Sequence, residues 1–515
     1  MSVVGPDDRR SAGAPTAAER WLGRLRACAM VGAGAVLLRL LLGVGFANYD
    51  TLYALVWGQQ LSRGESPQYA VPIAPTPHPL MEVLGTLAGP LGAHAAATIA
   101  VWVGYLALSA CGYLMFRLGS RLFNWPVGAL AALILLTRTP IVSYGSRAYI
   151  DLPFLAFMLA AMLVESRRRR AGGTVLWLLA LAGLLRPEAW VFAGLYWLYL
   201  AIPGRLVIDR GARRVRRVPA GEPAARDHRS PTELARLALL VAAAPLLWLL
   251  SDLLVTGNGL WSLTHTKATA ETLDRVTGIR NVPEYIPRRI GEVVRPVELA
   301  GAALGGVLSL MWMRQRAAIP AVVGVVAVLV FAALASFGLP IDTRYAFLAA
   351  AILCLFCAVG VFGWLLLPPD TSGRRGWALA GGTILLGLIV SIPSQRRSID
   401  TQLRSLARQE RIQNSLLDLV RDGAISTRCG PVGVPNHAPI PLLALYLKTT
   451  PGRVVSAHSA TEEIRHGVYV EAANQEVRRD YILDPHEPKP ARPVVPSGFR
   501  ATGGNASWIV YERCS

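Results

Sequence analysis

The sequence predicts an all-α, polytopic membrane protein of about eleven transmembrane helices, followed by a small C-terminal α/β domain. Two features of the composition favour this fold class. Of the 515 residues, 53% are hydrophobic and only 17% are charged, whereas soluble proteins carry about 25% charged residues. The third observation is that apolar runs of roughly 20 residues recur along the chain, each long enough to cross a ~30 Å hydrocarbon core.

The net charge of +19 comes largely from arginines in short clusters between the apolar runs, such as 167–170 and 213–217. In a soluble protein this charge would suggest nucleic-acid binding. The clusters instead follow the positive-inside pattern of membrane topology. The sequence carries no nucleic-acid-binding motif, so we expect no nucleic-acid partner.

The apolar runs define the expected topology. The predicted spans are 27–46, 93–116, 126–143, 151–165, 174–186, 188–203, 235–255, 298–313, 317–337, 345–367 and 376–393. With the N-terminus in the cytoplasm, every predicted inner loop is basic. The first run carries Arg39 and no clear cleavage site, so we expect an uncleaved helix, preceded by a disordered cytoplasmic tail over residues 1–26.

An odd number of spans divides the chain into a transmembrane domain, 27–393, and an extracytoplasmic C-terminal domain, 394–515. The C-terminal domain begins with an amphipathic stretch and continues with short apolar segments typical of strands. Cys429 and Cys514 bracket this segment, and an oxidising compartment favours a disulfide between them. The high Ala, Arg and Gly content indicates a GC-rich bacterium, and we expect an actinobacterium. The apolar spans then place the protein in the bacterial plasma membrane.

Polar side chains gather in five loops on the predicted outer face. The acids are Asp50, Asp151, Glu188 and Asp342, and the bases are Arg147, Arg186, Lys267 and Arg344. Ionisable groups at a membrane boundary are costly to bury and therefore indicate function. The loop 256–297 is basic although outer loops should be poor in Arg and Lys, which suits an anionic head group or phosphate.

Several short motifs carry a resemblance to a known family. They are Tyr49-Asp50 after the first helix, a long loop through Gly64 and Pro67 to Pro77-His78-Pro79-Leu80, Ser146-Arg147 followed by Asp151, Arg186-Pro187-Glu188, and Arg344-Tyr345. With these motifs the chain resembles GT-C-fold glycosyltransferases, which use a polyprenyl-phosphate sugar, in the branch of protein O-mannosyltransferases, lipid A aminoarabinose transferases and related actinobacterial enzymes. Many relatives carry two adjacent acids after the first helix, whereas Asp50 is followed by Thr51.

The resemblance implies inverting transfer of a sugar, with mannose or arabinose as the guesses, to a hydroxyl of an extracytoplasmic lipid, glycan or protein. Asp50 is the candidate general base, and Asp151 would support it or orient the acceptor. Cations must stabilise the departing phosphate, and the candidates are Arg147, Lys267, Arg288 and Arg344. Further candidates for substrate binding are Tyr345, Arg186, Glu188 and His78. A divalent metal is conceivable, but the spacing of the histidines does not indicate a metal site.

Each of these residues also has a purely structural interpretation. Asp50 and Asp151 could cap helices, Arg186 and Glu188 could form a structural ion pair, and Arg344 could extend from a helix end toward the interface. For the whole chain, the alternatives are a transporter and a non-catalytic envelope scaffold. A cavity on the outer face that joins the acids to a basic side chain would favour the enzyme.

Overall fold

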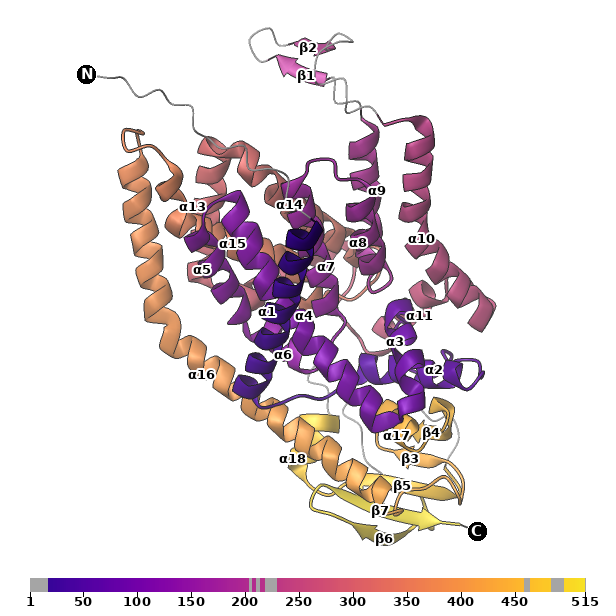
Figure 1. Cartoon of the computed structure of the whole chain (residues 1–515). Coiled ribbons are helices and arrows are strands. Elements are labelled where there is room, and N and C mark those ends of the chain that lie inside the picture. The colour runs from indigo at the N-terminus through magenta and orange to yellow at the C-terminus, as the bar shows by residue number, and fades with distance from the viewer. Residues whose placement is uncertain are drawn as a thin grey trace, which may run out of the picture.

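The computed structural model describes residues 17–202, 206–209, 214–217, 229–457, 464–482 and 495–514. Figure 1 shows a long helical bundle with a small sheet domain at one end. The helices are α1 (Ala17–Leu42), α2 (Tyr49–Ser62), α3 (Pro79–Ala88), α4 (Ala93–Leu122), α5 (Trp125–Leu136), α6 (Thr139–Ser146), α7 (Asp151–Arg167), α8 (Gly173–Gly183), α9 (Glu188–Ala201), α10 (Pro231–Thr256), α11 (Trp261–Thr272), α12 (Val282–Val293), α13 (Pro296–Trp312), α14 (Arg314–Ser336), α15 (Phe347–Phe362), α16 (Arg374–Arg421), α17 (Ile440–Tyr446) and α18 (Gln475–Val477). The strands are β1 (Leu206–Asp209), β2 (Arg214–Arg217), β3 (Val432–Val434), β4 (Val454–Ser456), β5 (Gly467–Ala472), β6 (Arg500–Gly504) and β7 (Trp508–Arg513).

The described helices make this a multi-pass membrane protein. Six of them are long and apolar enough to cross a bilayer, and two bent helix pairs raise the number of candidate spans to eight. The other three predicted spans correspond to α7, α8 and α9, which have 17, 11 and 14 residues. They are shorter than a usual span of about 20 residues, but α7 packs against α4 and α8, and α8 and α9 pack against α10 (Figure 1).

Two of the candidate spans are bent helix pairs, and the first of them corresponds to the predicted span 126–143. α5 and α6 meet at 66°, and the segment containing α12 meets α13 at 101°. Each second helix has a proline in its first turn, Pro140 in α6 and Pro296 in α13. Proline is favourable at a helix start but disfavours helical conformation in the residue before it. The prolines therefore explain why helices do not continue through these positions.

The N-terminal helix begins earlier than the sequence predicts. α1 starts at Ala17, so residues 17–26 are helical and do not belong to a disordered tail; residues 1–16 lie outside the described part of the chain. The segment contains good helix formers, including Ala, Leu, Glu and Arg. The predicted inner loop around 205–228 also lies mostly outside the described residues.

The core of the bundle surrounds α15, whose side chains are almost all buried. It packs against α5, α13, α14 and α16, and small residues allow the backbones to approach closely. A Cβ on Gly305 of α13 would stand 1.9 Å from the carbonyl oxygen of Phe356, so only glycine fits there. Cys354 and Cys357 are buried in this core with free thiols, which agrees with a packing role.

The C-terminal domain contains a mixed five-stranded sheet with the strand order β4-β3-β5-β7-β6. β3 runs parallel to both β4 and β5, whereas β7 is antiparallel to β5 and β6. The 48-residue helix α16 extends from the bundle into this domain (Figure 1) and contributes Ile412 and Leu416 to its core. The predicted domain boundary at 393/394 falls inside α16, next to Pro393.

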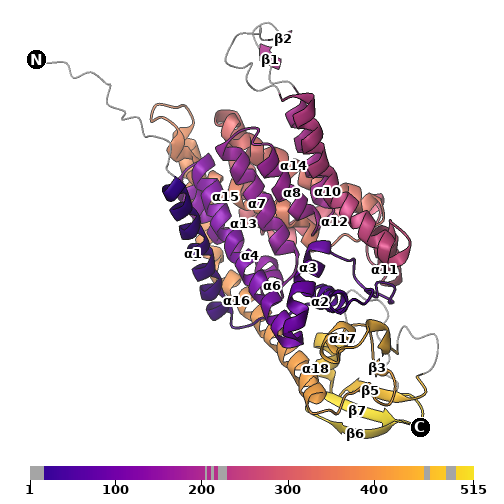
Figure 2. The same cartoon turned by 45° about the vertical axis from the view of Figure 1, so that its right-hand side comes forward.

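The short helices α2 and α3 and the first loop, residues 63–78, lie between the bundle and this sheet domain (Figure 2). α17 packs against α2, and the two belong to one apolar cluster with α16 and the sheet. The first loop therefore lies at the junction of the two parts of the protein, where its polar residues meet those of the bundle.

Candidate functional site

Asp50 stands at the start of α2, and the cap of that helix is Asn48. The Asn48 Oδ1 accepts hydrogen bonds from the backbone nitrogens of Asp50 at 2.8 Å and Thr51 at 3.2 Å. An asparagine in this role satisfies backbone N–H groups that would otherwise lack partners. The Asp50 carboxylate is therefore not needed as the cap, and it sits where the positive end of the helix dipole favours a negative charge.

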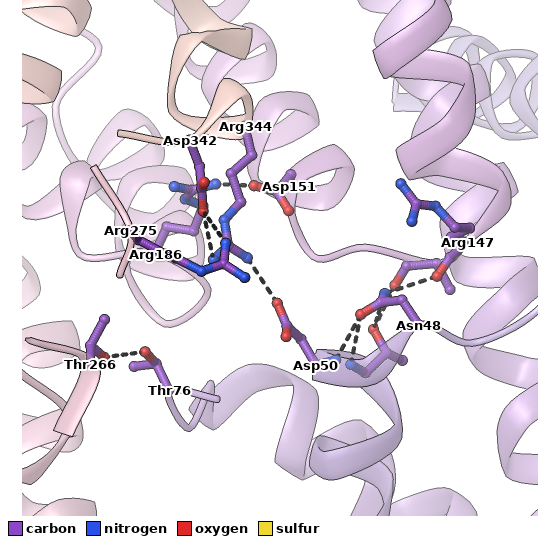
Figure 3. Close-up of polar contacts among 12 residues, drawn as sticks. Asn48, Asp50, Thr76, Arg147, Asp151, Arg186, Thr266, Arg275, Asp342 and Arg344 are labelled. Atoms are coloured by element: carbon purple, nitrogen blue, oxygen red, sulfur yellow. Dashed lines mark hydrogen bonds and ion pairs between the residues drawn. The ribbon is translucent and has the colours of Figure 1, made fainter. Parts of the chain in front are cut away.

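The Asp50 carboxylate faces Arg344 (Figure 3). Its Oδ2 accepts a hydrogen bond from Nη1 of Arg344 at 2.8 Å, and no described residue donates a hydrogen bond to its Oδ1. Arg344 also lies 3.6 Å from Asp342, which in turn lies 3.5 Å from Arg275. The side chain of Asp50 is 16% exposed, so one oxygen of this acid is held by a cation and the other remains open to a substrate.

A second ion-pair cluster is buried behind the first. Arg186, in the turn between α8 and α9, contacts Asp151 at the start of α7 and lies 2.6 Å from Glu188. Asp151 is only 1% exposed, and no capping bond is made at the start of its helix. The guanidinium of Arg186 also lies 4.4 Å from the centre of the Tyr345 ring. Asp151 therefore contacts Arg186 and holds that side chain in place, and it makes no contact with Asp50 among the described interactions.

Arg344 of the first cluster and Arg186 and Glu188 of the second line one small pocket, whose volume is about 20 Å³. Its polar lining comes from Arg186, Glu188 and Arg344, and its apolar lining includes Tyr345 and the residues Phe154, Phe192, Ala327, Val330, Phe331 and Leu348. A pocket that joins cations to an apolar wall suits an amphipathic ligand with an anionic group. The four predicted acids and two of the predicted bases, Arg186 and Arg344, are therefore brought together in two neighbouring clusters.

Arg147 lies near the start of α2 but does not line this pocket (Figure 3). Its guanidinium lies over the rings of Tyr144 at 5.3 Å and Tyr149 at 4.9 Å, and it makes no ion pair with a described acid. Burial raises the pKa of Tyr149, and the charges of Arg147, Asp50 and Arg344 all act on that phenol. Arg147 is therefore a cation close to the site whose charge is not neutralised by a carboxylate.

His78 is the last residue of the first loop and lies near the charges of Asp50, Arg344 and Arg186. It is buried, it precedes α3, and its ring meets Trp248 edge-on at 5.7 Å. Burial lowers its pKa to about 3, while the nearby charges of Asp50, Arg344 and Arg186 act in opposing directions. His78 is consequently neutral at physiological pH, and its buried Nδ1 has no partner among the described residues.

Two predicted phosphate-binding residues lie outside these clusters. Lys267 on α11 is exposed and packs against Gly338. The Arg288 side chain on α12 is 64% exposed, and its acidic neighbour is Glu292 at 3.8 Å. The neighbouring Arg289 points inward and donates to the carbonyl of Ile341 at 2.9 Å. Adjacent helical residues differ by about 100° in direction, so only one of these two arginines can face the site.

Two residues in or near the site, Asn48 and Arg275, were not among the predicted site residues. Arg275 pairs with Asp342, and Asn48 holds the start of α2 while its amide also donates to the carbonyl of Arg147 at 2.8 Å. An asparagine two residues before Asp50 is a recognisable capping signal. The partnership of Arg275 and Asp342 has no such local signal, because the two residues come from distant loops.

The arrangement provides four arginines, Arg147, Arg186, Arg275 and Arg344, around four carboxylates. Among the described residues, the one His/Cys/Asp/Glu group with metal-like spacing is Cys429, Glu512 and Cys514, and its cysteines are joined in a disulfide. At the site itself, guanidinium groups occupy the positions beside the carboxylates. Such a site can bind an anion and can accept a proton at Asp50.

No protein-family model and no curated protein sequence matches the chain. Among solved structures, the chain is similar to ArnT from Cupriavidus metallidurans bound to undecaprenyl phosphate, with 14% identity and a TM-score of 0.53 over 96% of this chain and 98% of ArnT. It also matches the Archaeoglobus fulgidus oligosaccharyltransferase in the apo form, with 11% identity and a TM-score of 0.44 over 85% of this chain and 65% of that one. The expected resemblance is thereby confirmed at the level of the fold, which is similar to that of ArnT along nearly the whole length of both chains.

Proposed function

We propose that the protein is a glycosyltransferase that moves a sugar from a polyprenyl-phosphate donor to a hydroxyl of an acceptor outside the cytoplasm. The observation that carries this proposal is the pairing of Asp50 with Arg344, because Arg344 also lines a pocket that has a second cation and an apolar wall. The ArnT-like fold supports the same class of reaction by analogy.

The chemistry needs a base on one side of the anomeric carbon and cations on the other. The acceptor oxygen attacks that carbon while Asp50 takes the hydroxyl proton on its open Oδ1. The bond from the anomeric carbon to the phosphate oxygen breaks, and its electron pair leaves with the polyprenyl phosphate. Attack opposite to the leaving group inverts the configuration at the anomeric carbon.

The leaving phosphate gains one negative charge during this step, and cations that meet it there lower the barrier. Arg344 is the first candidate because it lies in the pocket and touches Asp50. Arg147 is the second, since no described carboxylate neutralises it. Asp151 and Glu188 hold Arg186 at the pocket wall, and Tyr345 packs against that guanidinium.

The same proposal fixes the orientation of the protein. The basic loops 117–121 and 374–375 belong on the cytoplasmic side by the positive-inside rule. The site and the C-terminal domain then lie on the outer side of a bacterial plasma membrane, where Cys429 and Cys514 meet oxidising conditions. A lipid-linked donor suits that side, because its lipid phosphate is already an activated leaving group and the reaction then needs no nucleotide sugar.

The test is transfer of radiolabelled mannose or arabinose from polyprenyl phosphate by the purified full chain in lipid nanodiscs. Alkyl glycosides and a bacterial envelope extract serve as acceptors. We expect Asp50→Asn to lower the transfer rate by a factor of about 10² or more, because general-base catalysis contributes roughly 10²–10⁴. The matched control is Asp370→Asn, an exposed acid in a loop remote from the site.

Each outcome has a distinct meaning. Loss in Asp50→Asn alone, with an unchanged thermal midpoint, supports both the reaction and the base. Equal rates in wild type and Asp50→Asn would keep the reaction and remove Asp50 from its role. Absence of transfer by wild type with every donor and acceptor would refute the proposed function in favour of transport or scaffolding.

A further inference from the structure

One buried ion pair joins the two bent helix pairs of the bundle at their bends. Arg138 stands at the bend between α5 and α6, which meet at 66°. Glu298 lies in the first turn of α13, directly after the bend of 101° between α12 and α13. Nη1 of Arg138 donates to Oε1 of Glu298 at 2.5 Å, and the two side chains are 4% and 2% exposed. This contact therefore fixes one bend relative to the other.

The Arg138 guanidinium is also held by its own chain segment. Its Nε donates to the carbonyl of Ile134 in the last turn of α5 at 3.0 Å, and its Nη2 donates to the hydroxyl of Thr137 at 3.3 Å. Among the described residues Arg138 is the one donor to the Glu298 carboxylate, whose Oε2 is buried without a partner. A buried ion pair often stabilises a fold no better than apolar side chains of similar volume. What this pair adds is a fixed geometry between two bends.

The long helix α16 contacts both bends. The side-chain amide of Gln395, which is buried, donates to the carbonyl of Thr137 where α5 ends. Nη1 of Arg295, directly before α13, donates to the hydroxyl of Ser394 at 3.1 Å. Two adjacent residues of α16 thus hold the same two bends that the buried ion pair joins, and the three chain segments form one polar junction.

From the first bend, α6 leads to the candidate base. The end of α6 holds the start of α2, because the carbonyl of Arg147 accepts hydrogen bonds from the backbone nitrogen of Asn48 at 3.0 Å and from its side-chain amide at 2.8 Å. The hydroxyl of Thr51 donates to the carbonyl of Ala148 at 2.7 Å. Since α6 has eight residues, it is about 12 Å long. The position of Asp50 therefore depends on the bend through one short helix.

From the second bend, α12 leads to Arg344. Nε of Arg289 donates to the carbonyl of Ile341 at 2.9 Å, and the hydroxyl of Thr343 donates to Oε2 of Glu292 at 2.5 Å. Both contacts hold the turn directly before Arg344, and α12 also packs against α6. The candidate base and its cation are thus attached to the two bent helix pairs that the buried ion pair joins.

We infer that Arg138 and Glu298 are positioning residues of the proposed transfer, because their ion pair fixes the two bends and thereby the separation of Asp50 from Arg344. This inference rests on the proposed function and adds to it two residues that do not line the pocket. The base and the cation act in the same transition state, and a misplacement of about 1 Å can lower a rate by about 10²-fold. Loss of the pair should therefore lower kcat more than it raises the KM for the donor.

The activity test compares Arg138→Met, Glu298→Leu and the double variant with Glu165→Leu. Glu165 is a matched control because it is buried, accepts a 2.6 Å hydrogen bond from Tyr196 and lies near the end of α7, in neither bend. Transfer of radiolabelled sugar from polyprenyl phosphate by the full chain in nanodiscs gives kcat and the donor KM. Thermal unfolding in the same nanodiscs gives the midpoint of each variant.

We expect each single change at the pair to lower kcat about tenfold or more, with the donor KM within about threefold of wild type. The double variant should regain part of the thermal midpoint, because no buried charge is left without its partner, while its kcat stays low because the bends are no longer joined. Arg138→Lys keeps a cation for Glu298 and should recover part of the rate. Recovery of kcat together with the midpoint in the double variant, or an equal loss of kcat in Glu165→Leu, would overturn the inference.

A second measurement follows the geometry without the reaction. Nitroxide labels are placed on α2 by Leu61→Cys and on α12 by Glu284→Cys, two exposed positions. The background is Cys28→Ser, because the other free cysteines are buried. Double electron–electron resonance should give a shifted or broadened distance in Arg138→Met and in the double variant, and the wild-type distance in Glu165→Leu.

Unchanged label distances in every variant would overturn the inference and leave the proposed function intact. Failure of wild type to transfer sugar would instead refute the proposed function and the positioning role with it, while the label distances would still decide whether the ion pair fixes the two bends.

Discussion

Arg344 and Asp50 are 294 residues apart in sequence, yet Nη1 of Arg344 donates a 2.8 Å hydrogen bond to Oδ2 of Asp50. The contact joins the start of α2 to the turn that precedes α15, and it places a cation beside the candidate base. In the absence of a donor, each group neutralises the other. In the proposed reaction, a phosphate that binds Arg344 would compete for this cation and free the carboxylate of Asp50.

Replacement of Arg344 tests the cation at the leaving group. We expect Arg344→Ala to lower transfer by a factor of about 10²–10³, the usual effect of removing one preorganised donor from a transition-state charge. Arg344→Lys should recover only part of the activity, since an ammonium cannot form the planar two-point contact of a guanidinium. The measurement is transfer of radiolabelled sugar in nanodiscs.

Arg288→Ala is the matched control for Arg344→Ala, because the Arg288 side chain is 64% exposed and does not line the pocket. Its rate should remain within about twofold of wild type, as expected for an exposed surface charge. A large loss in Arg288→Ala would instead support its predicted role at the donor phosphate and would show that α12 moves when substrate binds.

The buried pair of Arg186 and Asp151 tests positioning. Asp151→Asn leaves a buried guanidinium with only Glu188 as its anionic partner. We expect it to reduce the free energy of unfolding by roughly 3–5 kcal/mol, the cost typical of breaking a buried ion pair. The double variant Asp151→Asn with Arg186→Met should be less destabilised than the two single changes predict when added. Thermal unfolding of all four proteins in one lipid mixture measures this coupling, and strict additivity would show that the pair is not coupled.

Glu82 on α3 provides a pH prediction. It is buried, it accepts a 2.6 Å hydrogen bond from Tyr69, and burial raises its pKa from 4.5 to about 7. Because the folded state holds this proton more tightly than the unfolded state, the Glu82 contribution to stability falls as pH rises from about 4.5 to 7. The full change corresponds to about 3 kcal/mol at 1.36 kcal/mol per pKa unit.

The comparison for Glu82 is made between wild type and Glu82→Gln, because His78, with its pKa lowered to about 3, changes stability in the opposite sense over part of this range. Glu82→Gln resembles the protonated acid, so it should match wild type at pH 5 and be more stable than wild type at pH 8. The exposed acid Glu284 provides the control variant Glu284→Gln. A constant difference between Glu82→Gln and wild type from pH 5 to 8 would contradict the raised pKa.

The disulfide between Cys429 and Cys514 gives a prediction for the C-terminal domain. It joins the segment before β3 to the end of β7 across a sequence separation of 85 residues. Closing a loop of this length stabilises the folded state by roughly 4 kcal/mol in the chain-entropy description. Cys514→Ser should therefore make residues 429–514 sensitive to protease at lower temperatures, whereas Cys28→Ser, a free exposed cysteine in α1, should not. Equal protease sensitivity in the two variants would show that the disulfide adds no stability.

Much of the fold could be predicted from local patterns. Each predicted span corresponds to a helix or to a bent helix pair, because a bilayer requires about 20 apolar residues whatever the rest of the chain does. The α/β character of the C-terminal domain was likewise visible in short apolar segments. The order of its strands was not, since the pairing of β3 with both β4 and β5 depends on contacts that no local period encodes.

The residues of the candidate site could be predicted only in part from the sequence. The residue types near Asp50, Asp151, Arg186 and Arg344 could be proposed from their loops and from a family resemblance. Except for the pair of Arg186 with Glu188, the partners of these residues could not be proposed from the sequence. Arg288 and Arg289 are neighbours in sequence, yet only Arg289 turns inward to the carbonyl of Ile341, because the direction of a helical side chain depends on how its helix packs.

The sequence by itself determined that this is a multi-pass membrane protein with a small domain after the last span, because hydrophobic length and composition act locally and independently of the final packing. Only the tertiary structure decided that Asp50 faces Arg344 and that Arg186 joins Asp151 to Glu188. Such pairs depend on the tilt, breaks and rotation of helices far apart in the chain. An ion pair forms only when packing brings two charges within a few ångströms of each other.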